Sequence, residues 1–435
     1  MKFLINLLTL VGSVVGVTAL AFMPWIVLLA LALVLAGWMA FTRRGQQAWS
    51  VTRVGVATIP QRLGSSAVVV IGIAGVVGVL VALLAMAEGF QATLKGTGTD
   101  DTAVVIRSGA LSELNSVMTH DAVVQVEQTP GVLKDAQGQV ISSAELVVVA
   151  SLPKKSNGLD ANVEIRGVGP QVWALRPHLQ ITGGRKFTPG LRELVVGKGA
   201  SQTFAGAALG SILTLNNQTW NIVGTFESGD AFDSELWGDT NIVGSTYRRG
   251  DSVTDVTVKL TSAGAFEAFK AALASNPQLT VDAKTTRDYF SSQSEGLAKL
   301  IRIIGTTIGV IMAIGAVFGA LNTMYAAVAT RAREIATLRA IGFRGLPVVV
   351  SVLLETMLLA LLGGVLGAAI AWLLFDKYTV STLGSNFSQV VFAFKVSPAL
   401  VLNGLKWALA IGLVGGLFPA LRAARLPVTT ALREL

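Results

Sequence analysis

The chain has 435 residues, of which 52% are hydrophobic and only 14% are charged, and its mean hydropathy is +0.63. This composition excludes an ordinary soluble domain and indicates an integral membrane protein. The net charge of +8 comes from cations that flank apolar segments, so it indicates cytoplasmic loops rather than nucleic-acid binding. No cysteine occurs, which excludes disulfides, zinc fingers and thiol nucleophiles.

Residues 1–42 are an apolar segment in which residues 3–41 carry no charge. This length is nearly twice the roughly 20 residues that one span needs. Two interpretations remain open: one long tilted helix, or a two-span hairpin that turns near Pro24. The hairpin is favoured, because proline can open a second helix and because Lys2 and Arg43 then lie on the same, cytoplasmic side. The run is too long for the apolar core of a signal peptide, so we expect it to be retained.

Residues 43–62 carry four arginines and no acidic residue. Trp49, Thr52 and Val56 recur there at roughly helical spacing, which predicts a basic helix on the cytoplasmic membrane surface. A basic loop stays an alternative, because Gly45 and Gly55 weaken a helix.

Residues 63–87 are predicted to be core span 1, with Gly72, Gly75 and Gly78 on a track that permits close helix packing. Residues 88–294 differ in composition, since they are polar and turn-rich and contain short β-branched alternations. About 200 residues of mixed strands and helices can bury a core of their own. We therefore expect a large α+β extracytoplasmic domain, with room for two lobes.

Residues 295–330 predict one helix of about 35 residues, which would reach roughly 50 Å. The hydrocarbon core is only about 30 Å thick, so its first turns should form a stalk outside the bilayer, followed by core span 2. Four glycines give two GxxxG spacings, which indicate bundle packing or, alternatively, a flexing role. The predicted segments that follow are a cytoplasmic segment at 331–345, core span 3 at 346–375, an external loop at 376–398, core span 4 at 399–421 and a cytoplasmic tail at 422–435.

Residues 331–345 combine four arginines with a single acid, Glu334. On a helix, Ile335, Leu338 and either Ile341 or Phe343 form an apolar stripe, and Gly342 offers a C-terminal stop. Two interpretations stay open on physical grounds. The segment is either a helix that inserts into a groove on a cytoplasmic partner or a positive loop that only fixes topology.

Glu355 lies about ten residues into core span 3, where a carboxylate is costly in hydrocarbon. One interpretation is a polar contact across a dimer or to the coupling region. The other is a carboxylate paired near the inner interface.

Catalytic chemistry is not apparent in the sequence. His120 and His178 are the only histidines, and neither belongs to a metal-binding motif. No GxxxxGK[ST] phosphate loop occurs, and the nearest run, at residues 197–199, lacks its spacing. We therefore expect no enzyme activity, no cofactor and no metal site in this chain.

Three stretches together resemble the permease core of the MacB/FtsX-type ABC transporter family. They are TRAREIATLRAIGF at residues 330–343, the Gly-rich LLETMLLALLGGVLGA that contains Glu355, and the terminal GGLFPALRAARLPVTTALREL. The run ITGGRKFTP at residues 181–189 is similar to the periplasmic core domain of the same family. The resemblance covers about residues 60–435.

The resemblance implies an α-helical membrane protein with a four-span permease core, to which the amino-terminal apolar hairpin is an addition. The large α+β domain would then be periplasmic, and the protein would lie in the bacterial inner membrane. Residues 331–345 would be the coupling helix that sits on a cytoplasmic ABC ATPase. The residues expected to make that contact are Arg331, Arg333, Glu334, Ile335, Arg339, Ile341 and Gly342.

The implied partners follow from the same family. They are two copies of the separate ATPase, which would hold ATP and Mg, and a second permease copy in a homodimer or heterodimer. A periplasmic adaptor protein and an outer-membrane channel are further family partners. The expected function is mechanical transmission to the periplasmic domain, with export or extraction of an amphipathic small molecule, a peptide or a lipid-linked molecule. The alternative is an FtsX-like transmitter that regulates a cell-wall hydrolase without transport.

Overall fold

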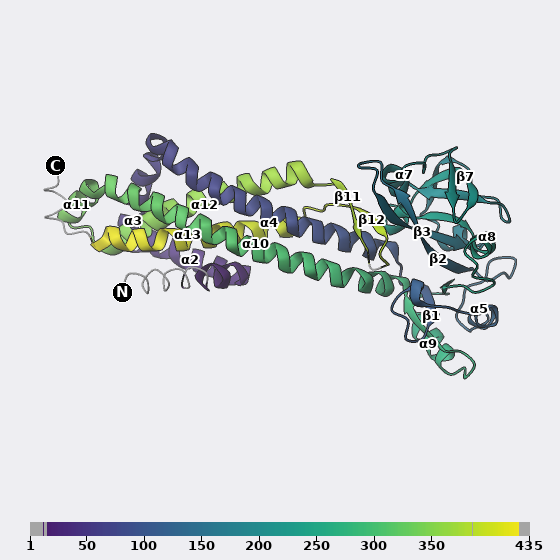
Figure 1. The fold of residues 1–435 in the computed structure, drawn as a ribbon. Helices are drawn as coiled ribbons and strands as arrows, with labels where there is room; N and C mark the ends of the chain where they lie inside the picture. Colours follow the sequence, from purple (N-terminus) through teal and green to yellow (C-terminus); the bar gives the residue numbers. More distant parts are fainter. Residues whose placement is uncertain (1–11, 13–14, 385, 426–435) are drawn as a thin grey trace. The chain divides into compact units, whose positions relative to one another are not determined.

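The computed structural model describes residues 12, 15–384 and 386–425, and these divide into two compact units. We call them the helical unit and the sheet unit (Figure 1). The helical unit comprises Met1–Met86, Ile301–Lys377 and Lys395–Leu435. The sheet unit comprises Ala87–Leu300 and Tyr378–Phe394.

Among the described residues, four helical stretches are long and apolar enough to cross a membrane. Each has 28 residues or more and contains an apolar window, whereas a span requires roughly 20 residues. Of two shorter helices that carry charged residues, α3 precedes the first of these stretches and α11 lies between the second and the third. The helices that lie wholly or partly in the helical unit are α2 (Trp25–Phe41), α3 (Arg43–Ala57), η1 (Ile59–Arg62), α4 (Leu63–Thr97), α10 (Thr286–Thr330), α11 (Ala332–Ala340), α12 (Gly345–Phe375) and α13 (Pro398–Arg425).

The amino-terminal segment bends by 102° between Val15–Phe22 and Trp25–Phe41. The break includes Pro24, where the sequence predicts a turn. The side chains on either side of it contact α13, because the Phe22 ring meets Trp407 edge-on and the Lys406 ammonium lies over the Trp25 ring. The bent pair counts as at most one span, which would make five in the described chain. The rest of the predicted hairpin, residues 1–11, 13 and 14, lies outside the described residues.

Glycines allow the helices of this unit to approach closely, as small residues do in membrane bundles. A Cβ at Gly367 of α12 would lie 2.3 Å from the Ala74 carbonyl oxygen of α4. Of the predicted track on α4, only Gly78 lies against another helix, and Gly72 and Gly75 face open space.

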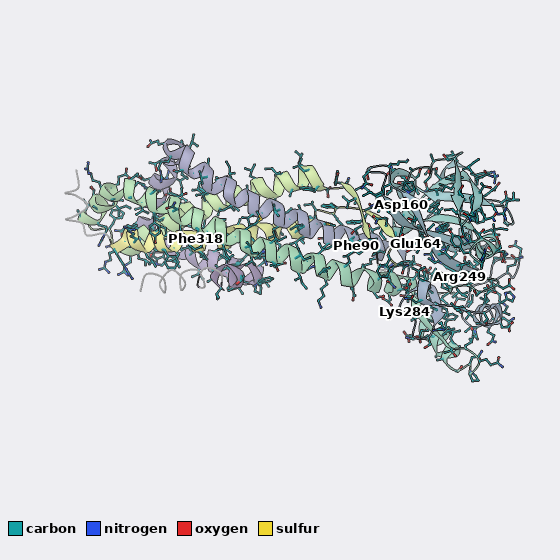
Figure 2. All side chains as sticks on the ribbon, in the orientation of Figure 1. Phe90, Asp160, Glu164, Arg249, Lys284 and Phe318 are labelled. Atoms are coloured by element: carbon teal, nitrogen blue, oxygen red, sulfur yellow. The ribbon has the colours of Figure 1, made fainter. Side chains whose placement is uncertain are left out.

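The two GxxxG pairs of α10 also differ in whether another helix packs against them. Gly305 and Gly309 pack against leucines of α4, whereas a Cβ at Gly315 or Gly319 would meet nothing within 4 Å. The neighbouring Phe318 is 44% exposed, which leaves this face of α10 unpartnered in the described chain (Figure 2).

The sheet unit contains one mixed ten-stranded sheet, in the order β10-β1-β9-β2-β3-β8-β5-β7-β4 with β6 beside β7. Its pairs are antiparallel except β3 with β8 and β5 with β7, which are parallel. The strands are β1 (Thr102–Arg107), β2 (Ser142–Pro153), β3 (Asp160–Val168), β4 (Gln180–Gly184), β5 (Glu193–Gly197), β6 (Ile212–Leu215), β7 (Gln218–Glu227), β8 (Leu236–Asp239), β9 (Asp255–Lys259) and β10 (Val281–Thr285).

Two hydrophobic cores lie along this sheet. One core surrounds Trp220 and Phe204, and the other surrounds Phe269 and Val256. The short helices that cover them are η2 (Glu113–Asn115), α5 (His120–Glu127), α6 (Val172–Leu175), α7 (Lys198–Thr203), η3 (Ala231–Ser234), α8 (Thr240–Thr246), η4 (Ala263–Ala265) and α9 (Phe266–Ala274).

Several boundaries differ from the sequence prediction. Helix α4 extends to Thr97, ten residues past the predicted end of core span 1 at 87, and α13 covers Pro398–Arg425 rather than 399–421. Helix α10 begins at Thr286, nine residues before the predicted start at 295. The predicted external loop at 376–398 contains an antiparallel hairpin of β11 (Thr379–Leu383) and β12 (Gln389–Ala393). This hairpin belongs to the sheet unit, where the Val391 amide donates to Ser234 Oγ at 2.8 Å.

Candidate functional site

Helix α11 is a short amphipathic helix at the end of the helical unit where α13 also ends (Figure 1). A one-residue break at Arg331 separates it from α10, and it ends at Ile341. Gly342 follows with φ of +105°, a left-handed conformation that favours glycine, and the Phe343 amide donates to the Leu338 carbonyl. The predicted glycine stop is therefore present.

The structure separates the seven predicted coupling residues into two groups. Ile335 is 5% exposed and packs with Met324, Val348 and Val352 of α10 and α12. The Arg331 side chain is 13% exposed and points into the same bundle. The remaining five lie toward the outside: Arg333, Glu334, Ile341 and Gly342 are exposed, and Arg339 is half-buried.

Glu355 of α12 forms ion pairs with two arginines from other segments of the helical unit. The residue is 2% exposed, and its two carboxylate oxygens take different partners. Oε1 accepts from Arg62 Nη2 at 2.7 Å, and Oε2 accepts from Arg331 Nη1 at 3.0 Å. Arg331 Nε also contacts Glu334 Oε2 at 3.2 Å. The carboxylate is thus paired, as one interpretation expects, and one of its partners directly precedes α11, as the other expects.

Helix α3 completes this arrangement. Its small or compact buried residues recur every three or four positions and pack on α12. At Gly55 a Cβ would lie only 3.0 Å from Glu355 Oε2 and 3.3 Å from Arg331 Nη1. The backbone of α3 therefore closes over the ion pairs. The helix that the sequence predicts for residues 43–62 is formed over Arg43–Ala57, and the loop alternative is wrong for that stretch.

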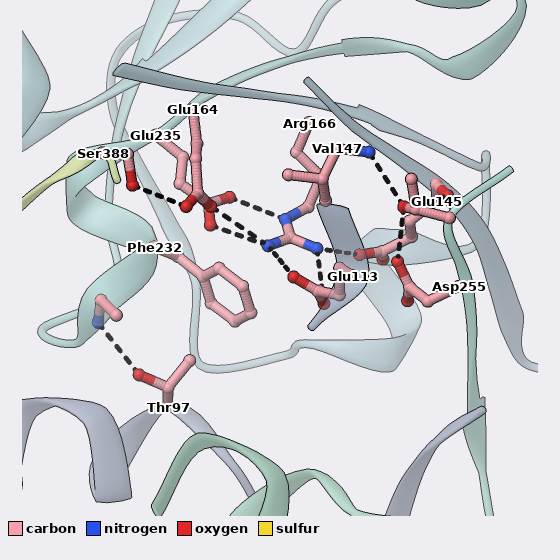
Figure 3. Close-up of polar contacts among 12 residues, drawn as sticks. Thr97, Glu113, Glu145, Val147, Glu164, Arg166, Phe232, Glu235, Asp255 and Ser388 are labelled. Carbon is pink, nitrogen blue, oxygen red and sulfur yellow. Dashed lines mark hydrogen bonds and ion pairs between the residues drawn. The ribbon is translucent and has the colours of Figure 1, made fainter. Parts of the chain in front are cut away.

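A second group of charges is buried inside the sheet unit (Figure 3). Arg166 of β3 is 1% exposed and lies among four carboxylates. Its Nε donates to Glu235 Oε2 at 2.8 Å, and its Nη1 donates to Glu113 Oε1 at 3.1 Å and to Glu145 Oε2 at 3.0 Å. The fourth carboxylate, on Glu164, lies 3.8 Å from Nη2. We call these residues, with Arg176 and Asp255, the Arg166 cluster.

Acidic residues outnumber the two guanidinium groups in the Arg166 cluster, and this determines their protonation. Burial and the nearby Glu235 raise the pKa of Glu164 to about 8. Burial also raises the pKa of Glu113 and Asp255. Although burial opposes it, the charges of Arg176 and Arg166 lower the pKa of Glu145. With a pKa of about 8, Glu164 is mostly protonated at neutral pH, which removes part of the excess negative charge.

Hairpin β11–β12 touches the Arg166 cluster. Ser388 Oγ donates to Glu164 Oε1 at 2.6 Å, beside a cavity of about 40 Å³. Within residues 12, 15–384 and 386–425, no three carboxylates or histidines are placed to hold a metal ion. His178 contacts Asp230 at 3.2 Å, and His120 is exposed at the start of α5. We interpret the Arg166 cluster as structural, since charge-assisted bonds join Glu145 of β2 and Arg166 of β3 to Glu235, which directly precedes β8.

Sequence reasoning missed this cluster. Its members are spread from Glu113 to Asp255, so no local motif brings them together. One feature of the sequence could have indicated it. Glu164 and Arg166 alternate with the apolar residues Val163 and Ile165, and in the structure all four side chains on β3 are buried.

Comparison with known proteins identifies the family. The model of the MacB-like periplasmic core domain matches residues 66–276, and that of the FtsX-like permease C-terminal domain matches residues 306–428. The uncharacterized ABC transporter permease YknZ of Bacillus subtilis (strain 168) is 25% identical over 407 residues, which cover 88% of this chain and 98% of that protein. The chain is an ABC transporter permease of the MacB/FtsX type.

Other relatives of this permease are longer. The macrolide export ATP-binding/permease protein MacB 1/2 of Paracoccus denitrificans (strain Pd 1222) is 25% identical over 403 residues, which cover 84% of this chain but 55% of that protein. MacB 2 of Yersinia pestis bv. Antiqua (strain Antiqua) is 31% identical over 159 residues, 34% of this chain and 22% of that protein. The permease thus spans about half the length of the Paracoccus MacB.

Two solved structures are similar to part of the permease. The extracellular domain of YknZ covers 42% of the chain at 17% identity with a TM-score of 0.33. The periplasmic region of MacB from Actinobacillus actinomycetemcomitans covers 46% at 14% identity with a TM-score of 0.34. The family assignment rests on the sequence matches. The FtsX-like match contains α11 and Glu355, and neither matching family model describes an ATPase.

Proposed function

We propose that this permease lies in the bacterial inner membrane and receives the work of ATP hydrolysis from a separate ABC ATPase at α11. It passes that work to the sheet unit as a mechanical stroke, by which a periplasmic or membrane-associated substrate is exported or extracted. The substrate would be an amphipathic small molecule, a peptide or a lipid-linked molecule. The complex would contain two ATPase copies, which hold ATP and Mg, and a second permease copy.

The observation that carries this proposal is the pairing of α11 with Glu355. A helix that transmits force must be fixed to the element that it moves. The buried ion pair of Arg331 with Glu355 fixes the start of α11 to α12, whereas a flexible loop alone would let α11 move independently. Arg331 and Ile335 anchor α11 from inside, so the ATPase contact falls to the outward residues Arg333, Glu334 and Arg339 with Ile341 and Gly342. The proposed ATPase contact is therefore reduced from the seven residues expected from the sequence to these five.

Helix α10 connects the sheet unit to α11 along the chain, so a force on α11 can reach that unit through this helix. Helix α10 has 45 residues and begins directly after β10 of the sheet. Such a helix is roughly 70 Å long and runs unbroken to Thr330, with Arg331 alone between it and α11. A displacement of α11 therefore acts on one end of a helix whose other end leaves the sheet unit.

The experiment is copurification of the full permease with a candidate ABC ATPase subunit from the same organism. The variant Arg333→Glu with Arg339→Glu should weaken the complex by tenfold or more, since two contact charges are reversed. The matched control, Arg248→Glu with Arg249→Glu, changes charge equally on exposed residues of the sheet unit and should leave the complex intact (Figure 2). An unchanged complex in the first variant, with unchanged elution and tryptophan fluorescence of the permease, contradicts the assignment of α11.

A further inference from the structure

A pocket of about 400 Å³ opens between α3, α11 and α12 in the helical unit. This volume is within the range of small-molecule sites and is far larger than a water cavity. Its walls are mainly apolar, and the polar groups gather at one side. The lining residues that matter here are Val51, Val54, Leu338, Phe343, Val348 and Val352.

Helix α3 carries unpaired positive charge next to this pocket. Ser50 and Val54 line the pocket, and Arg43 lies seven and eleven residues before them, which places all three on one stripe of the helix. Arg53 is adjacent to Val54. Both arginines are exposed, and no acidic side chain in the described part of the chain pairs with either.

The acids nearest the pocket do not compensate this charge. Glu334 lines it but contacts Arg331, and the Glu355 carboxylate is shared by Arg62 and Arg331. The pocket therefore has a mainly apolar interior, and the helix that forms one of its walls carries positive charge outside the lining. A ligand that fits both has an apolar tail and an anionic head.

The neighbouring helix indicates that the pocket faces lipid. Helix α2 has no buried residue, and Ile26 and Leu33 are 80% and 72% exposed. A helix that is apolar on all sides requires hydrocarbon around it. It ends at Phe41, which is 90% exposed, and α3 begins two residues later, so α3 starts where the hydrocarbon ends. Trp49 of α3, 53% exposed, suits this interface.

We propose that the α3–α11–α12 pocket binds an anionic phospholipid of the surrounding membrane. One acyl chain enters between Val54 and Leu338, and the phosphate of the headgroup lies beside Arg53, while Arg43, about 15 Å further along α3, adds long-range positive charge. The bound lipid then packs against α11 itself, so membrane composition acts on the helix that is proposed to couple the ATPase. The lipid site itself does not depend on that proposed function.

The experiment is a lipid titration of the full chain in detergent, read by native mass spectrometry, with phosphatidylglycerol and phosphatidylcholine of identical acyl chains. Wild type should bind phosphatidylglycerol more tightly by roughly 25-fold, at about fivefold for each arginine. Arg43→Gln with Arg53→Gln should abolish that preference. The control Arg192→Gln with Arg249→Gln removes two exposed arginines of the sheet unit and should preserve it.

A second pair of variants tests the pocket independently of charge. Val54→Trp fills the pocket from a position that is 56% exposed, so the bulky side chain is tolerated. It should eliminate saturable binding of both lipids. Val68→Trp on α4, at a position that is 58% exposed, adds the same ring away from the pocket and should not.

Two results would overturn the proposal. One is equal affinity of wild type for the two lipids. The other is a Val54→Trp chain that binds phosphatidylglycerol normally but loses the ATPase, because the pocket would then belong to a protein interface.

Discussion

Arg331 Nη1 lies 3.0 Å from Glu355 Oε2, and this ion pair joins the residue between α10 and α11 to the middle of α12. Since Arg62, just before α4, binds the other oxygen of the same carboxylate at 2.7 Å, three helices meet at one side chain. A change in the angle of α11 must therefore be shared by α10, α12 and the start of α4, or else break an ion pair that is almost completely buried. A substitution at Glu355 therefore tests coupling directly.

Glu355→Gln should destabilise the permease and uncouple it from its ATPase. The variant leaves two guanidinium groups facing a neutral amide, and removing one partner of a buried pair costs about 3 kcal/mol or more. Thermal unfolding in detergent and stimulation of the ATPase by the permease measure the two effects. Glu267→Gln, an exposed acid of α9, is the matched control. Unchanged coupling and assembly in Glu355→Gln would show that the ion pairs only satisfy a buried charge.

Gly55→Ala should loosen α3 from α12. The added methyl group would lie 3.0 Å from Glu355 Oε2, so either the carboxylate or the helix must move, and overpacking of this kind costs about 1–3 kcal/mol. Gly72→Ala on α4 is the matched control, since nothing lies within 4 Å of its Cβ and alanine favours a helix. The melting temperature should fall for the first variant and rise slightly for the second. A fall of equal size in both would point to a general effect of glycine replacement.

The sequence predicts those parts of this fold that depend on local patterns. Apolar runs locate α4, α12 and α13, and β-branched alternation indicates that the polar segment at residues 88–294 contains strands. Helix α11 follows from its amphipathic stripe and from Gly342. Each of these elements is predicted by a pattern that lies within its own residues.

The sequence could not predict contacts between distant residues. The first turns of α10 are polar, and they are held by tertiary contacts such as the bond from the Glu113 amide to the Tyr289 hydroxyl at 2.9 Å. Arg62 and Glu355 are 293 residues apart, so the sequence marks Glu355 as costly without naming its partner. The Arg166 cluster draws its members from several strands for the same reason.

Arg166→Met should destabilise the sheet unit more than any exposed arginine does. It leaves Glu113, Glu145 and Glu235 without their shared counter-charge inside the protein, which costs about 3–5 kcal/mol. Fluorescence of the buried Trp220 and Trp237 reports unfolding of this unit in the full chain. Arg249→Met, an exposed residue, is the control. Equal melting temperatures for the two variants would contradict the structural role assigned to the Arg166 cluster.

The stability of the sheet unit should fall as pH rises from about 4.5 to about 8, and Glu164 should contribute to that fall. Its pKa is raised to about 8, mainly by burial and also by Glu235, against a usual value of 4.5. Between these values the folded state retains a proton that the unfolded state releases, so folding becomes less favourable as pH rises. Glu164→Gln cannot ionise and still offers Ser388 an acceptor, so its advantage over wild type should grow across this window. Each 1 kcal/mol gained raises Tm by about 2–4 °C, which fluorescence can resolve at pH 5 and pH 8. A Tm difference between variant and wild type that is the same at both pH values would show that Glu164 does not titrate there.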